Sequence, residues 1–251
     1  MRLPIAIIAA VAGAAIVAGS SSAKAGTLPS RLEGLDGAEE IVEISNRAGL
    51  PEDWIAFLLA KSYVETGGKF DPLLGRGRAN GAPLNAKINK SQSEQASAER
   101  AWDRLVEQGR LNPDLWPRES WIFGSGGLFA LIPASVLVGT YEKSGMEDDP
   151  KIMDPWSVFD PTIAVFLAID YNDRLMGWAG YKSEKTWGNL YKGWKQPSNM
   201  GKDNDTTQRS VQAFREALTA TGSNPNLADR KPTPIPDPMT VIRPLIFGGM
   251  S

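Results

Sequence analysis

Apolar residues recur at helical spacing along most of the chain after residue 30, and Gly or Pro residues separate one such run from the next. The pattern predicts helices over residues 38–48, 51–66, 93–109, 161–177 and 205–221. Strand signals are weak. The longest candidate, GLFALIPASVLVG at 127–139, contains Pro133 and fits a helix that starts near this residue better than a strand. The sequence therefore predicts a mainly α fold.

Local signals at the helix starts support these boundaries. Three pairs of residues have the spacing of a capping pair, namely Asp36 with Glu39, Ser91 with Glu94, and Asp205 with Gln208. Asp160 and Pro161 begin the helix of residues 161–177, whose first half is apolar nearly all round. A helix that is apolar on every face is buried, so this helix is expected at the centre of the core.

Residues 30–222 are expected to form one domain, and the composition of the chain changes sharply after the last predicted helix. From Ser223 onward the chain contains six prolines, at positions 225, 232, 234, 236, 238 and 244. Proline removes a backbone donor and cannot continue a helix, so residues 223–251 are predicted to form an extended tail without regular structure.

The first 25 residues have the order of a secretory signal peptide. Arg2 is followed by an uncharged apolar run over residues 3–19 and then by Ala23-Lys24-Ala25, after which cleavage is expected. The alternative is an uncleaved membrane anchor, because the run is only slightly shorter than the roughly 20 residues of a spanning helix. On either interpretation we expect export to the periplasm or cell envelope.

Composition excludes several classes of protein. The chain has 251 residues, no cysteine and no histidine, and a formal net charge of -2. A nucleic-acid partner is not expected, since such domains usually carry a strong basic excess. Disulfides, histidine-based nucleophile systems and the usual zinc sites are excluded, and no metal or cofactor is expected. Any acid-base catalysis therefore falls to Asp, Glu, Lys or Tyr.

Glu65 is the candidate acid. It lies seven residues after Leu58 on the apolar stripe of its helix, one residue before Thr66 and just ahead of the Gly67-Gly68 break. Burial and the negative end of the helix dipole are both expected to raise the pKa of this carboxyl. A carboxylic acid that stays protonated near neutral pH can protonate the leaving oxygen of a glycosidic bond. The alternative is a surface acid beside a glycine cap.

Three segments carry a resemblance to a known family. ETGGKFDP at 65–72, GLFALIPAS at 127–135 and DPTIAVFLAIDYNDRL at 160–175 resemble, in order and chemistry, the motifs of lysozyme-like lytic transglycosylases, which include virion-associated members from bacteriophages. The matching positions are Glu65, Thr66, Gly68, Phe70 and Pro72, then Gly127, Leu128, Leu131, Pro133 and Ala134, and finally Asp160 and Pro161. The resemblance covers about residues 35–195.

The resemblance implies a lysozyme-like fold and cleavage of peptidoglycan glycan strands between MurNAc and GlcNAc, with formation of 1,6-anhydroMurNAc ends. It implies that Glu65 is the single catalytic residue. A hydrolytic lysozyme would normally add a second carboxylate, but Asp71 lies beyond the glycine break and is interpreted as a loop or capping residue. The implied substrate-binding residues are Thr66, Ser125, Gly127, Leu128, Phe129 and Tyr191.

Two departures from the family pattern leave an alternative open. Ala130 stands where the family usually has Gln, and the segment between the first two motifs, residues 73–125, is long and carries its own predicted helix. The alternative is a non-catalytic or weakly active phage virion protein, an ejection or tail component that keeps the lysozyme-like fold as a scaffold. Its partners would be other virion proteins, and residues 3–19 would allow membrane association.

Two further features have two interpretations each. Trp187, Tyr191 and Trp194 recur at helical spacing, which is typical either of core positions or of a sugar-binding groove. Tyr191 is the one that loosely matches the family pattern. Residues 73–90 contain four basic side chains and no acidic one. They would either face the carboxylates of peptide stems in the cell wall or form a solvated loop.

Overall fold

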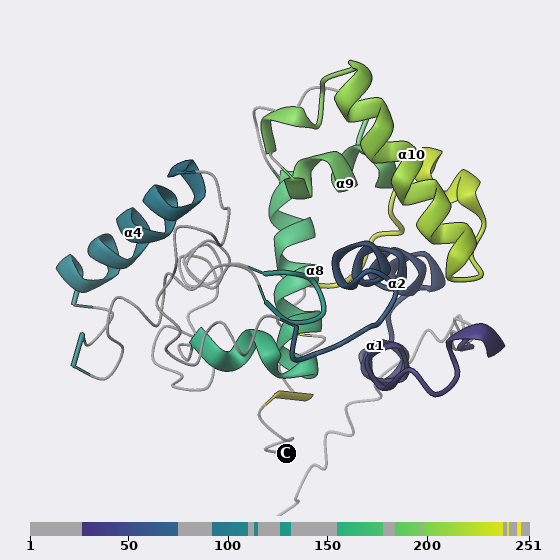
Figure 1. Cartoon of the computed structure of the whole chain (residues 1–251), viewed down its shortest axis with the longest axis horizontal. Coiled ribbons are helices and arrows are strands. Elements are labelled where there is room, and N and C mark those ends of the chain that lie inside the picture. The colour runs from purple at the N-terminus through teal and green to yellow at the C-terminus, as the bar shows by residue number, and fades with distance from the viewer. Residues whose placement is uncertain are drawn as a thin grey trace, which may run out of the picture.

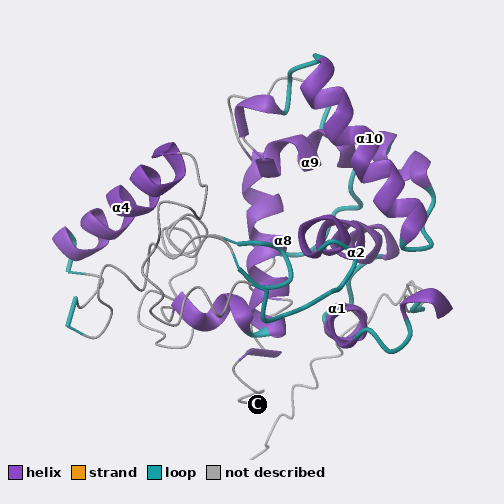
Figure 2. Cartoon of the chain, in the orientation of Figure 1, coloured by secondary structure: helices purple, strands orange, loops and turns teal. Residues whose placement is uncertain are grey.

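The structure is a computed structural model of the chain, and it describes residues 27–74, 92–109, 113–114, 126–131, 155–177, 184–195, 197–237, 240 and 245–246. Within these ranges the ordered elements are helices, and no strand occurs beyond one isolated bridge between Gly126 and Leu131 (Figure 2). The prediction of a mainly α fold is confirmed.

The helices follow the chain in this order: η1 (Ser30–Leu32), α1 (Asp36–Arg47), α2 (Glu52–Thr66), α4 (Gln92–Glu107), η2 (Pro155–Phe159), α8 (Pro161–Gly177), α9 (Trp187–Lys195), η3 (Pro197–Asn199), α10 (Asp205–Ala220) and η4 (Pro225–Asp229). All five helices predicted within the described ranges are present, with ends that differ from the predicted ends by at most two residues. The helix predicted near Pro133 and the basic run after Leu74 lie outside the described residues.

The helices α2 and α8 supply the centre of the core. Trp54, Phe57 and Leu58 of α2 are completely buried, and α8 is buried continuously over residues 163–170. The helix α2 packs against α1 and α10, while α8 packs against α1 and α9 (Figure 1). The predicted central position of residues 161–177 is confirmed, because a helix that is apolar nearly all round needs neighbours on every side.

The start of α8 is capped as the sequence predicted, whereas the capping residue of α10 lies one residue earlier than predicted. The Oδ1 atom of Asp160 accepts hydrogen bonds from the backbone of Thr162 at 2.8 Å and of Ile163 at 3.1 Å. In α10 the cap is Asn204, which forms a reciprocal capping box with Thr207. The predicted pair Asp205 with Gln208 was wrong because Asn204 is itself a favourable cap one residue earlier.

The predicted cap of α1 was also wrong, and that of α4 lies beyond what the structure describes. Leu35 occupies the N-cap of α1 without a side-chain hydrogen bond, and Asp36 lies inside the first turn. The Oε1 atom of Glu39 instead accepts a hydrogen bond from the backbone of Gly34 at 2.8 Å. For α4, Ser91 and the side chain of Glu94 are outside the described part of the chain.

The segment after Ser223 was predicted to be an extended tail without regular structure, and the structure corrects this for residues 225–229. Residues 225–229 form η4, which packs on α9 and α10 and buries Leu227 and Ala228. Burial of these two apolar side chains stabilises the packing of the segment against the domain, despite its prolines. We call residues 225–237 the docked tail.

One carboxylate fastens the docked tail to the start of α2. The Oδ2 atom of Asp53 accepts a hydrogen bond from the backbone N–H of Thr233 at 2.7 Å and another from the Trp187 indole N–H at 3.1 Å. In return, the Trp54 indole N–H donates to the Thr233 carbonyl at 2.8 Å. The backbone N–H of Trp187 in α9 also donates to the Arg230 carbonyl at 2.9 Å, so the tail is hydrogen-bonded to both α2 and α9.

The two ends of the long segment 75–125 meet at one backbone hydrogen bond. The Gly127 N–H donates to the Leu74 carbonyl at 2.9 Å, and the neighbouring Gly126 lies against the Phe159 ring. The helix α4 comes from the middle of this segment and lies to one side of the helical body (Figure 1). Its presence confirms the prediction that this segment carries its own helix.

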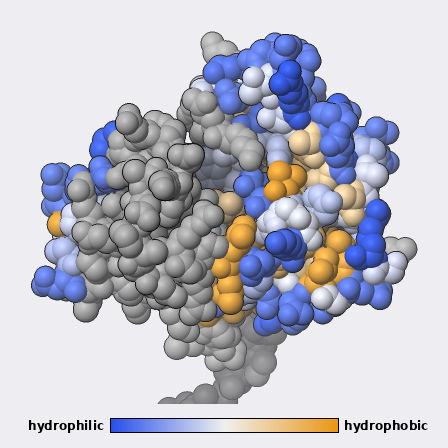
Figure 3. Space-filling view, in the orientation of Figure 1, coloured by the Kyte–Doolittle hydropathy of each residue, from blue (hydrophilic) through white to orange (hydrophobic). Residues whose placement is uncertain are grey.

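The described surface offers neither a membrane-spanning helix nor, on the face drawn in Figure 3, a large apolar area. No helix in the described ranges is long and apolar enough to cross a membrane, and residues 3–19 lie outside those ranges. Most of the described surface in Figure 3 is hydrophilic, and hydrophobic residues form small separate patches. Scattered patches of this kind are normal for a protein surface.

Candidate functional site

Glu65 lies in the last turn of α2, immediately before the turn that ends this helix. Gly67 has the left-handed conformation with φ of 62°, and the Gly68 N–H donates to the Tyr63 carbonyl at 2.8 Å. This arrangement is a common way to end a helix at glycine. The Glu65 side chain is 15% exposed. The carboxyl group is therefore largely buried, as its position on the apolar stripe predicted.

Lys61, one turn earlier on α2, forms an ion pair with Glu65. The distance from Lys61 Nζ to Glu65 Oε1 is 2.5 Å, and the Lys61 side chain is only 3% exposed. Two unit charges 4 Å apart in a partly buried setting attract by about 4 kcal/mol, whereas a helix end contributes about 0.3–1 kcal/mol. Lys61 therefore acts against the effects from which a protonated Glu65 was expected, and it favours the carboxylate.

Two aromatic rings of α9 border the Lys61 ammonium group. The distance from Lys61 Nζ to the ring centroid is 4.5 Å for Trp194 and 5.5 Å for Tyr191. Burial, and to a smaller extent the negative charge of Glu65, raises the pKa of the Tyr191 phenol above its usual value, so this group stays neutral. We call Lys61, Glu65, Tyr191 and Trp194 the candidate site.

The two interpretations of the α9 aromatic residues are separated by their contacts. Trp187 is completely buried and stacks on Phe57 at 4.6 Å between ring centroids. Tyr191 is 1% exposed and stacks on Phe214 at 4.8 Å. Both residues belong to the core. Trp194 is partly buried and is held by a hydrogen bond from its indole N–H to Asn172 Oδ1 at 2.8 Å.

The three segments that carry the motif resemblance meet in space. A Cβ atom on Gly37 of α1 would overlap the Phe70 carbonyl oxygen and would lie 2.7 Å from Leu128. A Cβ atom on Gly127 would overlap the Val158 carbonyl oxygen. The loop after Glu65, the turn at residues 126–131 and η2, which directly precedes α8, are thus in close backbone contact, and glycine is needed at these contacts.

The turn at residues 126–131 is closed by two hydrogen bonds between Gly126 and Leu131, both at 2.9 Å. Ala130, which stands where the resembling family usually has Gln, has φ of 49°. Few residues other than glycine adopt this left-handed conformation, and when they do the strain is often associated with a functional site. Alanine has no side-chain polar group, so position 130 offers only its backbone to a ligand.

The other residues implied as substrate-binding are occupied within the chain. The Thr66 hydroxyl donates to the Ser62 carbonyl at 2.8 Å and accepts from the Phe70 N–H at 2.9 Å. Leu128 and Phe129 are buried in the core. Ser125 lies outside the described residues, and substrate contact by Thr66, Gly127, Leu128, Phe129 and Tyr191 stays a prediction. The Asp71 carboxylate accepts from the Leu73 N–H at 2.9 Å, which confirms its predicted role in the loop.

Sequence reasoning missed Lys61. Residues four apart lie on the same face of a helix, so the spacing between Lys61 and Glu65 predicts an ion pair in the same window that pointed to Glu65. Trp194 lies more than 130 positions after Lys61 in the chain, so no local sequence pattern indicates their contact. Among the described residues, no group of three or more acidic side chains is placed to hold a metal ion.

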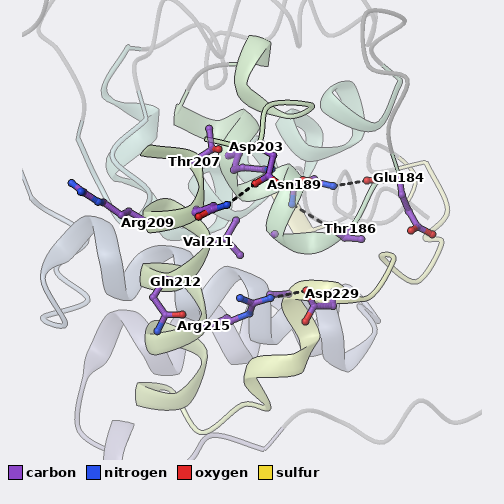
Figure 4. Close-up of a pocket in the computed structure, with 14 residues that line it drawn as sticks. Glu184, Thr186, Asn189, Asp203, Thr207, Arg209, Val211, Gln212, Arg215 and Asp229 are labelled. Carbon is purple, nitrogen blue, oxygen red and sulfur yellow. Dashed lines mark hydrogen bonds and ion pairs between the residues drawn. The ribbon is translucent and has the colours of Figure 1, made fainter. Parts of the chain in front are cut away.

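A polar groove of about 830 Å³ lies between α9, α10 and the docked tail (Figure 4). Neither Glu65 nor any aromatic side chain lines it. Its polar side chains bond one another, for example Arg215 with Asp229 at 2.7 Å and Gln208 with Asp203 at 3.2 Å. The groove lacks the aromatic face on which a sugar ring would stack, and it is not part of the candidate site.

Glu40 makes the stability of the described helices depend on pH. Burial, and then the negative charges of Asp36, Asp160 and Glu43, raise the pKa of the Glu40 carboxyl above 4.5. A raised pKa means that the folded protein binds this proton more tightly than the unfolded chain does. Stability from this group is therefore present at low pH and is lost as the pH rises through the folded-state pKa.

We expect Glu40→Gln to raise the melting temperature slightly at pH 7, because the amide removes the buried negative charge. The gain should vanish below about pH 4, where Glu40 is protonated in both states. Thermal unfolding at pH 4 and pH 7 measures this, with Glu33→Gln, at an exposed position, as the control. An equal effect of Glu40→Gln at both pH values would contradict the prediction.

No protein-family model matches the chain, and comparisons with the curated proteins and with the solved structures found no match.

Proposed function

We propose that this protein is a peptidoglycan lytic transglycosylase that cleaves the β-1,4 bond between MurNAc and GlcNAc with Glu65 as its single catalytic residue. The observation that carries the proposal is the meeting of three segments at the end of α2. The loop after Glu65, the turn at residues 126–131 and η2, which directly precedes α8, are separated by tens of residues in the sequence, yet they pack together directly.

In the proposed reaction, Glu65 gives its proton to the glycosidic oxygen as the bond from C1 of MurNAc to that oxygen breaks. The resulting carboxylate then takes a proton from the 6-hydroxyl of MurNAc, and the oxygen of this hydroxyl bonds to C1. The proton on Glu65 is restored and no water is consumed. One carboxyl group is sufficient for both steps, and the carboxylate of Asp71, the next acidic residue along the chain, is engaged by its own loop.

The proposal includes the place where the protein acts. Residues 3–19 would direct it to the periplasm or cell envelope, either through a cleaved signal peptide or as a membrane anchor, and virion carriage is the counterpart in a bacteriophage. Peptidoglycan is accessible from each of these places.

A second candidate function is that of a non-catalytic virion component with the same fold. Two observations favour it: Lys61 favours the charged form of Glu65, and Leu128, Phe129 and Tyr191 are buried in the core. Ala130 adds to this, because it provides no amide for a sugar. This candidate predicts that the chain releases nothing from peptidoglycan.

Digestion of purified peptidoglycan by the full chain, with mass analysis of the released muropeptides, separates the two candidates. We expect anhydromuropeptides from the wild type and at least about a hundredfold less from Glu65→Gln, which is the usual contribution of a general acid. The exposed substitution Glu43→Gln on α1 is the matched control and should leave release unchanged. Products with reducing ends would indicate hydrolysis, and no release by the wild type would overturn the proposal.

A further inference from the structure

Lys61 is the most unusual side chain near Glu65, because a lysine is rarely buried to this degree. It extends along the same face of α2 as Glu65, and their charged atoms are 2.5 Å apart. Exposed pairs at this helical spacing contribute little to stability. Here both side chains are largely shielded from water, so the attraction between them is screened much less.

The surroundings favour a positive charge on Lys61. The ring of Trp194 lies 4.5 Å from its ammonium nitrogen, and an aromatic face attracts a cation at this range. Both neighbouring rings are fixed by other contacts, Tyr191 by stacking on Phe214 and Trp194 by its hydrogen bond to Asn172. The ammonium group therefore lies in a preformed enclosure that has a carboxylate on one side.

The charged and titratable groups on the neighbouring helices do not replace Lys61 as the cation bound to Glu65. From α9, Tyr191 is a neutral phenol. From α8, Arg174 is paired with Asp170 at 3.0 Å and faces the ring of Tyr171, which in turn packs on Trp194. This second pair thus lies behind the aromatic residues.

We propose that Lys61 is a positioning residue that fixes the Glu65 carboxyl group and holds it in the charged form. The inference rests on the proposed function, in which Glu65 must carry a proton before it can act. An enzyme of this design would be active mainly at acidic pH, and the lysine would set the upper limit of its pH range. Residue 61 would thereby control when the acid step can occur without contacting the reacting atoms.

The test is a titration of the full chain with ¹³C-labelled glutamate side chains, in which the Glu65 signal is identified by its loss in Glu65→Gln. In Lys61→Met, which keeps the length of the side chain but not its charge, we expect the Glu65 midpoint to move to higher pH by about one unit or more. Lys61→Arg keeps the charge, so its Glu65 midpoint should stay close to that of the wild type. The alkaline limb of the pH profile of kcat/KM should move in the same direction as the midpoint.

The outcomes separate this inference from the proposed function. A midpoint that does not change in Lys61→Met would overturn the role of Lys61, and so would a wild-type midpoint above about pH 7, because Glu65 would then not be held in the charged form at neutral pH. The wild-type measurement decides the matter even if Lys61→Met does not fold. If the midpoint shifts as expected but no variant releases muropeptides at any pH, the proposed function fails while the control of the Glu65 charge by Lys61 is upheld.

Discussion

Gly127→Ala is expected to lower the free energy of unfolding by about 2–5 kcal/mol. The added methyl group would overlap the Val158 carbonyl oxygen, so the turn at residues 126–131 and η2 would have to separate. Overpacking typically costs about 1–3 kcal/mol, and the left-handed φ of 70° adds about 1–2 kcal/mol for any residue other than glycine. Urea denaturation measures the loss.

Gly67→Ala is the matched control for this substitution. Gly67 also has a left-handed conformation, with φ of 62°, but an added methyl group there meets no atom within 4 Å. It should therefore lose only the backbone term of about 1–2 kcal/mol. If the two variants lost the same amount, the close packing between Gly127 and Val158 would not be a source of stability.

Asp53→Ala is expected to lower the free energy of unfolding by about 1–3 kcal/mol and to release the docked tail. The substitution leaves the Thr233 N–H and the Trp187 indole N–H without the carboxylate that accepts their hydrogen bonds. The Thr233 N–H is exposed and can bond to water, whereas the indole N–H is partly buried, and a buried donor without a partner costs about 1–3 kcal/mol. Besides stability, the rate of trypsin cleavage after Arg230 measures the release, because this bond lies where the tail joins the domain.

Glu52→Ala is the matched control for the tail. Glu52 is the exposed acid next to Asp53, and it lies in the same first turn of α2. Both substitutions remove a negative charge from a helix start, but only Asp53→Ala removes the two hydrogen bonds. Equal stability and equal cleavage of the two variants would show that Asp53 does not hold the tail.

The sequence predicted the helices well because their signals are local. The helix over residues 161–177 was found to the residue, since Asp160 and Pro161 define its start and the apolar pattern defines its centre. The capping residue of α10 was mispredicted because Asn204 and Asp205 are both acceptable caps, and only the reciprocal contact with Thr207 selects between them. Side-chain geometry determines which of two neighbouring residues caps a helix, and the sequence alone does not show this geometry.

The docked tail could not be predicted because its contacts are distant in the sequence. Thr233 and Asp53 are separated by 180 positions. Residues 231–237 form no helix or strand, as the prolines indicated, but a segment without regular structure can be free or bound. This segment is bound because the Asp53 carboxylate on α2 accepts a hydrogen bond from the Thr233 backbone N–H.

The candidate site was predicted in part. The place of Glu65 at the end of a buried helix followed from apolar spacing and two glycines. The pairing with Lys61 was available from the same spacing, whereas the enclosure by Trp194 depends on how α9 packs against α2. The charge state of an acid depends on such neighbours. The apolar spacing therefore predicted the position of Glu65 but not whether its carboxyl group is charged.

The hydrogen bond between Leu74 and Gly127 holds together the two points where the chain enters and leaves residues 75–125. Leu74 and Gly127 adjoin, so the length of the chain between them can change without moving these two residues apart. Doubling the length of a loop whose ends adjoin costs only about 0.6 kcal/mol. Evolution or an engineer could therefore shorten, enlarge or exchange this part as a module while the backbone around Glu65 keeps its geometry.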